Sequence, residues 1–544
     1  MTTEMTCSDA IVKSLIKHGV DTVFGIPGAQ TYALYDALSR HKSDINLVIT
    51  RHEQGAGYMA FGYAQSTGKI GAYCVVPGPG LLNSTAALCT AHNTPVLCIT
   101  GQVPSKFLGV GHGMLHELAD QLGILRSLTK WAGRINHAAE TPALMSTAFK
   151  KLTTGRIRSV ALEVPMDTLA EKASIDVDFP DAPSASYTAS PDTIRAAAEI
   201  LRSAKNPMIF VGSGAIHASQ EINILAEVLQ APVVSFRSGK GIVSDASPYG
   251  FNCASAYKLY SQVDVAIGIG SRLELPAFRW QSGVATSKLI RIDIDPTQLV
   301  RLRAEVSIVA DSKLATRALL SELERTPPKP ESKVEKFKKI KQESLQEIQK
   351  LQPQMTYLNI MREVLPDDGI LVEEISQVGF TSWFGFPVYQ PRQFVSGGYQ
   401  GNLGHGFQTS LGVKIANPDK VVFSIAGDGG IMFGIQELAT AVQYKIGVIL
   451  LIFNNNAYGN VRRDQINFFD GNVVGSELQN PDFIKLAESF GAQASRAHSF
   501  EEFRQQLSMA LEKSEHGPVV IEIPCDADSE TSPWEFIMPA GYGS

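Results

Sequence analysis

The sequence predicts an α/β protein with three domains, each built on a doubly wound parallel sheet. Its 544 residues amount to about 3.6 typical domains of roughly 150 residues each. Short apolar, β-branched runs alternate with stretches of helical periodicity, a pattern typical of βαβ units whose sheets are covered on both faces. The apolar fraction of 44% and the charged fraction of 19% are those of an ordinary folded protein and exclude wholesale disorder.

The first block of alternating elements contains helical and strand-like segments in turn. We expect helices at Ser8–His18 and Gln54–Ser66 and strands at Asn46–Thr50, Ala72–Val76 and Val96–Thr100. Ser8 is the expected N-cap of the first helix, because a short polar side chain can accept a hydrogen bond from the first turn.

The second and third blocks repeat this pattern. In the second, the expected elements are the helix Ile194–Ser203, the strands Met208–Gly212, Val263–Gly268 and Leu289–Asp295, and a helix near Leu314–Glu324. In the third, strands are expected at Ile370–Glu373, Val421–Ala426, Val448–Phe453 and Val519–Ile523.

Two breaks in the pattern divide the chain. Asp181–Pro191 is rich in Pro, Ser and Ala and is interpreted as a linker. Thr326–Lys350 begins with three prolines and continues with Lys and Glu, which predicts a solvated helix. The expected domains are therefore residues 1–175, 190–325 and 353–530, with a C-terminal tail at 531–544.

Charge and cysteine usage narrow the class of partner and the compartment. The net charge of −6 gives no basic surface for nucleic acid or anionic membranes. The longest apolar runs, such as Ile446–Phe453, are far too short to cross a bilayer. The six cysteines form no CxxC or metal-ligand spacing, and the N-terminus does not resemble a signal peptide. We expect a cytoplasmic protein with reduced, structural cysteines and no nucleic-acid or membrane partner.

The most specific motif lies in the third block. Gly427-Asp428-Gly429 follows one expected strand, and Asn454-Asn455 closes the next after 24 intervening residues. Loops at the carboxyl ends of parallel strands can face one crevice. Carboxylate and amide oxygens suit Mg²⁺, and the glycines let backbone N–H groups approach a diphosphate.

With this motif, the sequence resembles the thiamine-diphosphate (ThDP)-dependent family of 2-oxo acid decarboxylases and carboligases along essentially its whole length. The resemblance implies pyrimidine-binding, central and diphosphate-binding domains, in that order. It implies that Mg²⁺ is held by Asp428, Asn455 and the carbonyl of Ala457. The residues implied at the diphosphate and the rest of the cofactor are Gly427, Gly429, Gly430, Ser376, Gln377 and Tyr458.

A second match to the family stands in the first block. Arg51-His52-Glu53 is followed by an apolar segment that begins near Met59. The resemblance makes Glu53 the catalytic carboxylate, which bonds to the aminopyrimidine ring of the cofactor and promotes proton transfer within it. The glycine-rich turn Pro77–Gly80 with Asn83 matches the segment beside the active site.

The loop before the GDG strand, Ser396–Gly406, also resembles the family. The resemblance implies that Leu403 supports the bent conformation of the cofactor and that the Gly401 carbonyl receives its amino group.

The subfamily is left open by the sequence. Gly101–Pro104 and Ala119–Ile124 look like acetolactate synthase, but His116-Glu117 stands where that enzyme has Phe-Gln. His116 and Glu117 are therefore candidates for proton transfer, whereas Leu403 and Glu373–Ser376 resemble benzoylformate decarboxylase. The expected reaction is decarboxylation of a 2-oxo acid followed by protonation or carboligation. The substrate, and the roles of His112 and Arg462, are left open.

The central block contains Gly212–Gly214 and Gly268–Gly270, neither of which completes a dinucleotide fingerprint. We expect no flavin (FAD) there. A CoA or ADP site, as in oxalyl-CoA decarboxylase or 2-hydroxyacyl-CoA lyase, is the alternative. In this family Glu53 and Asp428 come from different subunits, so the resemblance implies a homodimer at least and a homotetramer as the common form.

Overall fold

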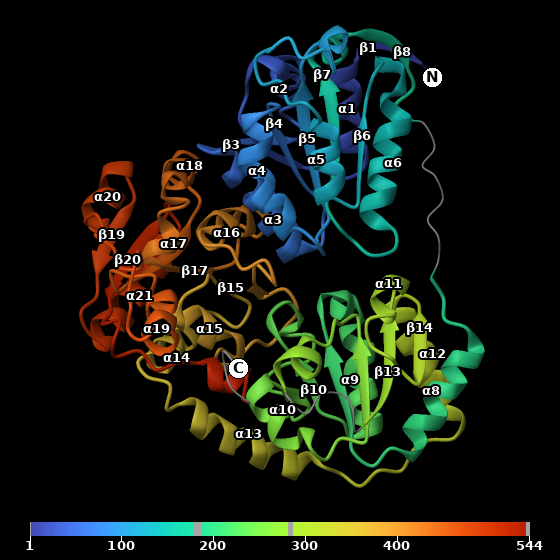
Figure 1. The fold of residues 1–544 in the computed structure, drawn as a ribbon, viewed down its shortest axis with the longest axis vertical. Coiled ribbons are helices and arrows are strands. Elements are labelled where there is room, and N and C mark those ends of the chain that lie inside the picture. The colour runs from blue at the N-terminus through green and yellow to red at the C-terminus, as the bar shows by residue number, and fades with distance from the viewer. Residues whose placement is uncertain (1, 179–186, 281–286, 540–544) are drawn as a thin grey trace.

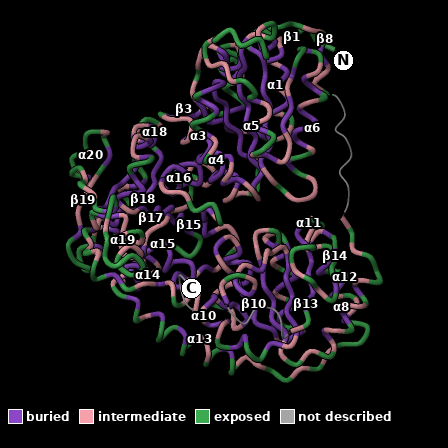
Figure 2. The backbone as a smooth tube through the Cα atoms, in the orientation of Figure 1, coloured by how far each residue is buried: buried purple, intermediate pink, exposed green. Residues whose placement is uncertain are grey.

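The structure, a computed structural model, describes residues 2–178, 187–280 and 287–539, and it contains three six-stranded parallel sheets. Figure 1 shows the three domains as separate lobes: the first at the top, the third at the left and the central one at the lower right. The predicted α/β class with three doubly wound domains is confirmed. Buried residues gather inside each lobe (Figure 2).

The first domain has the strand order β3-β2-β4-β5-β7-β6. Its strands are β2 (Thr22–Gly25), β3 (Asn46–Ile49), β4 (Gly71–Val75), β5 (Val96–Gln102), β6 (Trp131–Arg134) and β7 (Val160–Pro165), and an antiparallel pair joins β1 (Thr3–Thr6) to β8 (Lys172–Ile175). Its helices are α1 (Cys7–Lys17), α2 (Tyr32–Arg40), α3 (Glu53–Thr67), α4 (Pro79–Thr90), α5 (Gln121–Leu128), α6 (Thr141–Thr153) and α7 (Met166–Ala170).

The central domain has the strand order β11-β10-β9-β12-β13-β14. Its strands are β9 (Pro207–Val211), β10 (Val233–Ser235), β11 (Gly250–Phe251), β12 (Val265–Ile269), β13 (Lys288–Asp293) and β14 (Val306–Val309). The helices are α8 (Pro191–Ser203), α9 (Ser219–Leu229), α10 (Cys253–Tyr260), α11 (Pro296–Leu299) and α12 (Ser312–Arg325), and α13 (Val334–Ile348) leads to the third domain.

The third domain has the strand order β16-β15-β17-β18-β20-β19. Its strands are β15 (Ile370–Val372), β16 (Phe394–Val395), β17 (Val422–Gly427), β18 (Val448–Asn454), β19 (Gln493–Arg496) and β20 (Val519–Pro524). Its helices are α14 (Gln354–Val364), α15 (Gln377–Gly385), α16 (His405–Ala416), α17 (Asp428–Ile431), α18 (Leu438–Gln443), α19 (Gly459–Phe468), α20 (Phe483–Phe490), α21 (Phe500–Lys513) and α22 (Trp534–Ile537).

Two local predictions need correction. The N-cap of α1 is Thr6, whose hydroxyl accepts from the Asp9 N–H at 3.0 Å, and Ser8 instead donates to the Leu169 carbonyl. Helix α13 is only partly solvated, because Phe337 on one face is buried against the rings of Tyr249 and Phe251. Most of the predicted linker Asp181–Pro191 lies outside the described residues.

The first and third domains pack through α3 and α16 (Figure 1). A Cβ on Gly62 of α3 would lie 2.1 Å from the Thr409 carbonyl oxygen, and one on Gly412 of α16 would lie 1.9 Å from that of Met59. Glycine is therefore required where the two helices cross. No helix in the described part of the chain is both long and apolar enough to cross a membrane.

Candidate functional site

Asp428 and Asn455 lie at the same edge of the third sheet. Strands β17 and β18 are neighbours in parallel register, with Gly427 paired to Phe453, so the residues that follow both strands emerge together. Asp428 is buried and begins α17. Burial raises the pKa of the Asp428 carboxyl, against hydrogen bonds from Asn480 and from backbone N–H groups that lower it.

Asn480 holds three side-chain oxygens together at this edge, and the sequence analysis did not identify it. Its Nδ2 lies 2.6 Å from Asp428 Oδ2, 2.9 Å from Asn454 Oδ1 and 3.2 Å from Asn456 Oδ1. Three oxygens therefore converge around one polar hydrogen-bond donor. Hard oxygen donors of this kind are those that Mg²⁺ prefers, so the residues present fit the implied metal.

The Asn455 side chain is oriented at both ends. Its Nδ2 donates to Glu530 Oε2 at 3.0 Å, and its Oδ1 accepts from the Ala457 N–H at 3.1 Å. Glu530 is buried, which raises its pKa to about 7. Tyr458 lies over Gly429, where a Cβ would meet the Tyr458 Cε1 at 2.5 Å. The absence of a side chain at Gly429 therefore lets the Tyr458 ring pack directly against its backbone.

Glu374 holds the loop that carries Gly401 and Leu403. Its carboxylate accepts from the N–H groups of Gly404 at 2.7 Å and Gly406 at 3.1 Å. Burial raises the pKa of Glu374 to about 7, although these two hydrogen bonds and the charge of a nearby histidine lower it. Gly401 is exposed, and its φ of +55° is one that glycine adopts readily.

Ser376 and Gln377 lie at the start of α15, near Gly427 at the end of β17. Ser376 is the N-cap and accepts from the Gly379 N–H at 3.0 Å. Gln377 Oε1 accepts from Arg463 at 2.8 Å. The C-terminal tail reaches the same place, because Trp534 Nε1 donates to Asn460 Oδ1, which also lies 3.5 Å from Gln377 Nε2.

Glu53 is the first residue of α3, and its carboxylate is half-buried. Its Oε2 accepts from Asn83 Nδ2 at 3.1 Å, and a Cβ on Gly80 would lie 3.4 Å from its Oε1. The predicted turn Pro77–Gly80 and Asn83 therefore do lie beside Glu53. In the described part of the chain, no hydrogen bond or ion pair joins Glu53 to Asp428.

The start of α3 is fixed by a residue that the sequence did not indicate. The buried Glu437 of the third domain accepts from the backbone N–H groups of Arg51, at 3.1 and 3.2 Å, and of His52, at 2.9 Å. This carboxylate anchors the residues just before Glu53 to the neighbouring domain of the same chain.

His116 and Glu117 have different surroundings. His116 Nδ1 lies 3.1 Å from Gln30 Oε1, and its φ of +67° is in the left-handed region that non-glycine residues rarely adopt. The Glu117 carboxylate accepts from the N–H groups of Gly111 and Met114, and these bonds hold its pKa below the ordinary value. Glu117 therefore stabilises its own loop, whereas the His116 ring faces another segment of the domain.

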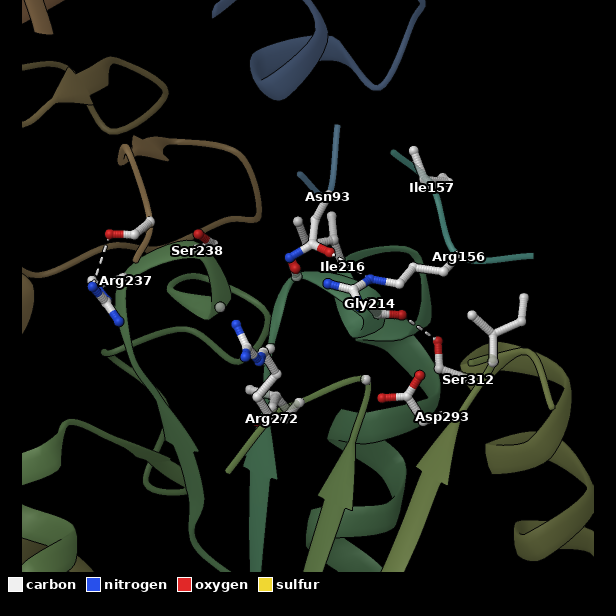
Figure 3. Close-up of a pocket in the computed structure, with 18 of the residues that line it drawn as sticks. Asn93, Arg156, Ile157, Gly214, Ile216, Arg237, Ser238, Arg272, Asp293 and Ser312 are labelled. Carbon is white, nitrogen blue, oxygen red and sulfur yellow. Dashed lines mark hydrogen bonds between the residues drawn. The ribbon is translucent and has the colours of Figure 1, made fainter. Parts of the chain in front are cut away.

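A cavity of about 460 Å³ lies where the three domains meet. The carboxyl ends of β9, β12 and β13 form its floor, and Arg272, Asp293 and Ser312 stand around it (Figure 3). Gly214 and Gly270 approach so closely that a Cβ on Gly270 would lie 2.4 Å from the Gly214 carbonyl carbon. Glycine-rich turns at the carboxyl end of a parallel sheet are typical of nucleotide sites.

The residues around Asp428 at the edge of the third sheet and those around Glu53 at the start of α3 are the two candidate half-sites. The fold that carries them is that of an α/β enzyme, and comparisons with known proteins show its family. Residues 5–124, 194–319 and 374–523 match the family models described as the N-terminal TPP binding, central and C-terminal TPP binding domains of thiamine pyrophosphate enzymes. The chain therefore belongs to the thiamine-pyrophosphate-dependent enzyme family that acts on 2-oxo acids, which confirms the resemblance.

Similar proteins match over nearly their whole length. A probable acetolactate synthase large subunit of Methanococcus aeolicus is 31% identical over 97% of this chain and 93% of its own. A probable 2-ketoarginine decarboxylase of Pseudomonas aeruginosa is 31% identical over 95% and 94%. Acetolactate synthase isozyme 1 large subunit of Escherichia coli is 29% identical over 98% and 96%.

Proposed function

We propose that this chain is an Mg²⁺- and ThDP-dependent enzyme that releases CO₂ from a 2-oxo acid and then protonates the remaining fragment or joins it to a second carbonyl compound. The observation that carries the proposal is that Asp428 and Asn455 lie together at the carboxyl edge of β17 and β18, where the Asn455 backbone N–H bonds the Asp428 carboxylate. The names of its relatives include both a synthase and a decarboxylase. The proposal therefore keeps both fates of the fragment, protonation and joining to a second carbonyl compound.

The residues have distinct roles in this proposal. Asp428, Asn455 and the Ala457 carbonyl hold Mg²⁺, while Gly427, Gly429, Gly430, Ser376, Gln377 and Tyr458 surround the diphosphate, and Gly401 and Leu403 contact the rest of the cofactor. When bound, ThDP supplies the nucleophilic carbon that adds to the 2-oxo carbonyl and accepts the electrons left when CO₂ departs. Glu53 exchanges a proton with a ring nitrogen of the aminopyrimidine.

His116 is the better candidate for moving a proton to or from the substrate. Glu117 already accepts two hydrogen bonds from its own loop, whereas His116 is held by Gln30 in a strained backbone conformation. Such strain is concentrated at functional sites. Histidine is the side chain that most often transfers protons in general acid–base catalysis.

The proposed active form is a homodimer or a dimer of dimers. Leu82 beside Asn83 is 43% exposed, and Met432 and Phe433, which follow the GDG turn, are 44% and 49% exposed. These exposed apolar side chains lie beside the Glu53 region and the Asp428 region, where a second copy of this chain would cover them. Four of the six cysteines are buried, and the other two are partly buried, free thiols, which suits a cytoplasmic location.

The substitution Glu53→Gln tests the catalytic proposal. The variant keeps the shape of the side chain but cannot take up a proton, so we expect intact Mg²⁺–ThDP binding by calorimetry and loss of nearly all CO₂ release. Glu335→Gln, in the first turn of the distant helix α13, is the matched control and should keep full activity. Full turnover by Glu53→Gln would refute the assigned role.

The three-domain cavity favours one second candidate, a CoA-linked lyase or decarboxylase of the oxalyl-CoA decarboxylase or 2-hydroxyacyl-CoA lyase type. Its glycine turns and Arg272, whose guanidinium lies 4.7 Å from the Tyr399 ring centre, suit a nucleotide diphosphate and base. Calorimetric titration with CoA, ADP and FAD separates the candidates. Binding of CoA or ADP supports the CoA-linked reaction, and our proposal expects no binding of FAD.

A further inference from the structure

The Asn455 amide has a fixed orientation because each of its ends has a partner. A backbone N–H only donates, so the end of the amide that faces Ala457 must be Oδ1, and the end that faces Glu530 is Nδ2. The other end, Oδ1, therefore points away from Glu530. It accepts one bond, from the Ala457 N–H at 3.1 Å, and a carbonyl oxygen has a second lone pair for a further partner.

Glu530 is itself held in place from several sides. Its backbone carbonyl accepts from Arg463 at 2.9 Å. The next residue, Thr531, donates through its N–H and its hydroxyl to the Gln352 carbonyl, both at 3.1 Å, and accepts from Gln354 at 2.6 Å. The segment after β20 therefore fixes a buried carboxylate beside the metal-binding loop.

We propose that Glu530 is a positioning residue for the metal centre, which orients Asn455 so that its Oδ1 faces Mg²⁺. The inference rests on the proposed function, because it takes Asn455 to be a metal ligand. Outer residues that orient a ligand typically change metal affinity by about 10- to 100-fold when they are removed. Without Glu530, the amide can rotate and present Nδ2, which cannot bind a cation.

The test measures metal binding directly, with Mn²⁺ as the probe. Free Mn²⁺ is followed by electron paramagnetic resonance while it is titrated into the full-length protein with saturating ThDP. We expect Glu530→Ala to weaken the Mn²⁺ affinity by about 10-fold or more. Glu530→Gln can still offer an oxygen to Asn455 Nδ2, and we expect it to stay within about threefold of the wild-type affinity.

Glu477→Ala is the matched control for charge. Glu477 lies near the metal loop but is 76% exposed, and its ion-pair partner Arg462 is 3.9 Å away. Its removal deletes one negative charge without touching Asn455, so we expect unchanged Mn²⁺ affinity. Equal weakening by Glu477→Ala would show a general charge effect and overturn the inference.

Two further measurements separate orientation from stability. The metal-free melting temperature reports folding, and if Glu530→Ala fails to fold, Glu530→Asp moves the carboxylate back by one methylene and should weaken Mn²⁺ binding in its place. In an Asn455→Ala background, removal of Glu530 should cost no further affinity. An undiminished affinity in the folded Glu530 variants would overturn the inference alone, whereas absence of Mn²⁺ binding to the wild type with ThDP would overturn the proposed metal site.

Discussion

Glu374 is a fully buried carboxyl group that accepts from the N–H groups of Gly404 and Gly406, and burial raises its pKa from 4.5 to about 7. In the unfolded chain the group ionises near its ordinary pKa. The folded state resists ionisation, so the stabilisation that Glu374 contributes is fully present below pH 4.5 and is lost as the pH rises through about 7.

The substitution Glu374→Gln should remove this pH dependence. We expect the free energy of unfolding of the wild type to fall, relative to that of Glu374→Gln, by about 1 kcal/mol per pH unit in the interval between the two pKa values. Urea denaturation at a series of pH values measures the difference. A constant difference between the two proteins from pH 4 to 8 would contradict the assigned pKa shift.

Some residues of the candidate site could be predicted from the sequence, and others could not. Asp428 and Asn455 could be predicted because each follows a buried strand, and adjacent parallel strands end at one edge. Asn480 and Glu530 lie in irregular segments, 52 residues from Asp428 and 75 residues from Asn455 respectively. Their positions depend on tertiary contacts that have no local pattern, so sequence reasoning missed both.

At the scale of elements, the expected strands agree with the structure to within a few residues, because buried parallel strands appear as compact apolar runs. The helix boundaries are less predictable from sequence. Threonine and serine both suit an N-cap. The helix α1 begins one residue earlier than expected, with Thr6 as its N-cap, and the Ser8 hydroxyl is instead bonded to the Leu169 carbonyl.

Helix α13 also shows why polarity alone misleads. Its charged residues predicted a solvated helix, yet Phe337 is 2% exposed among aromatic rings of the central domain. We expect Phe337→Ala to reduce the stability of that domain by about 3 to 5 kcal/mol, since it leaves a cavity. Urea denaturation measures the loss, with the exposed Leu345→Ala on the same helix as control. Equal, small effects of both changes would show that α13 does not contribute to the core.

For the whole molecule, no hydrogen bond or ion pair within the described residues joins Glu53 to Asp428 of the same chain, although Glu437 holds the backbone just before Glu53. Exposed apolar side chains lie beside both residues. We expect Glu53→Gln and Asp428→Ala to be inactive separately. When the two variants are co-expressed, a site shared between two chains regains one intact copy per heterodimer, so about a quarter of wild-type activity should return. A mixture that stays inactive would indicate a site within one chain.

We propose that this fold uses ThDP and Mg²⁺ to release CO₂ from a 2-oxo acid. The most direct test measures CO₂ release by the wild-type protein with and without ThDP and Mg²⁺, across aliphatic, aromatic and CoA-linked 2-oxo acids, with product analysis in the presence of an aldehyde acceptor. We expect CO₂ release from at least one plain 2-oxo acid, and this release should depend on both ThDP and Mg²⁺. Absence of CO₂ release from every acid by protein shown to contain bound Mg²⁺ and ThDP would contradict it.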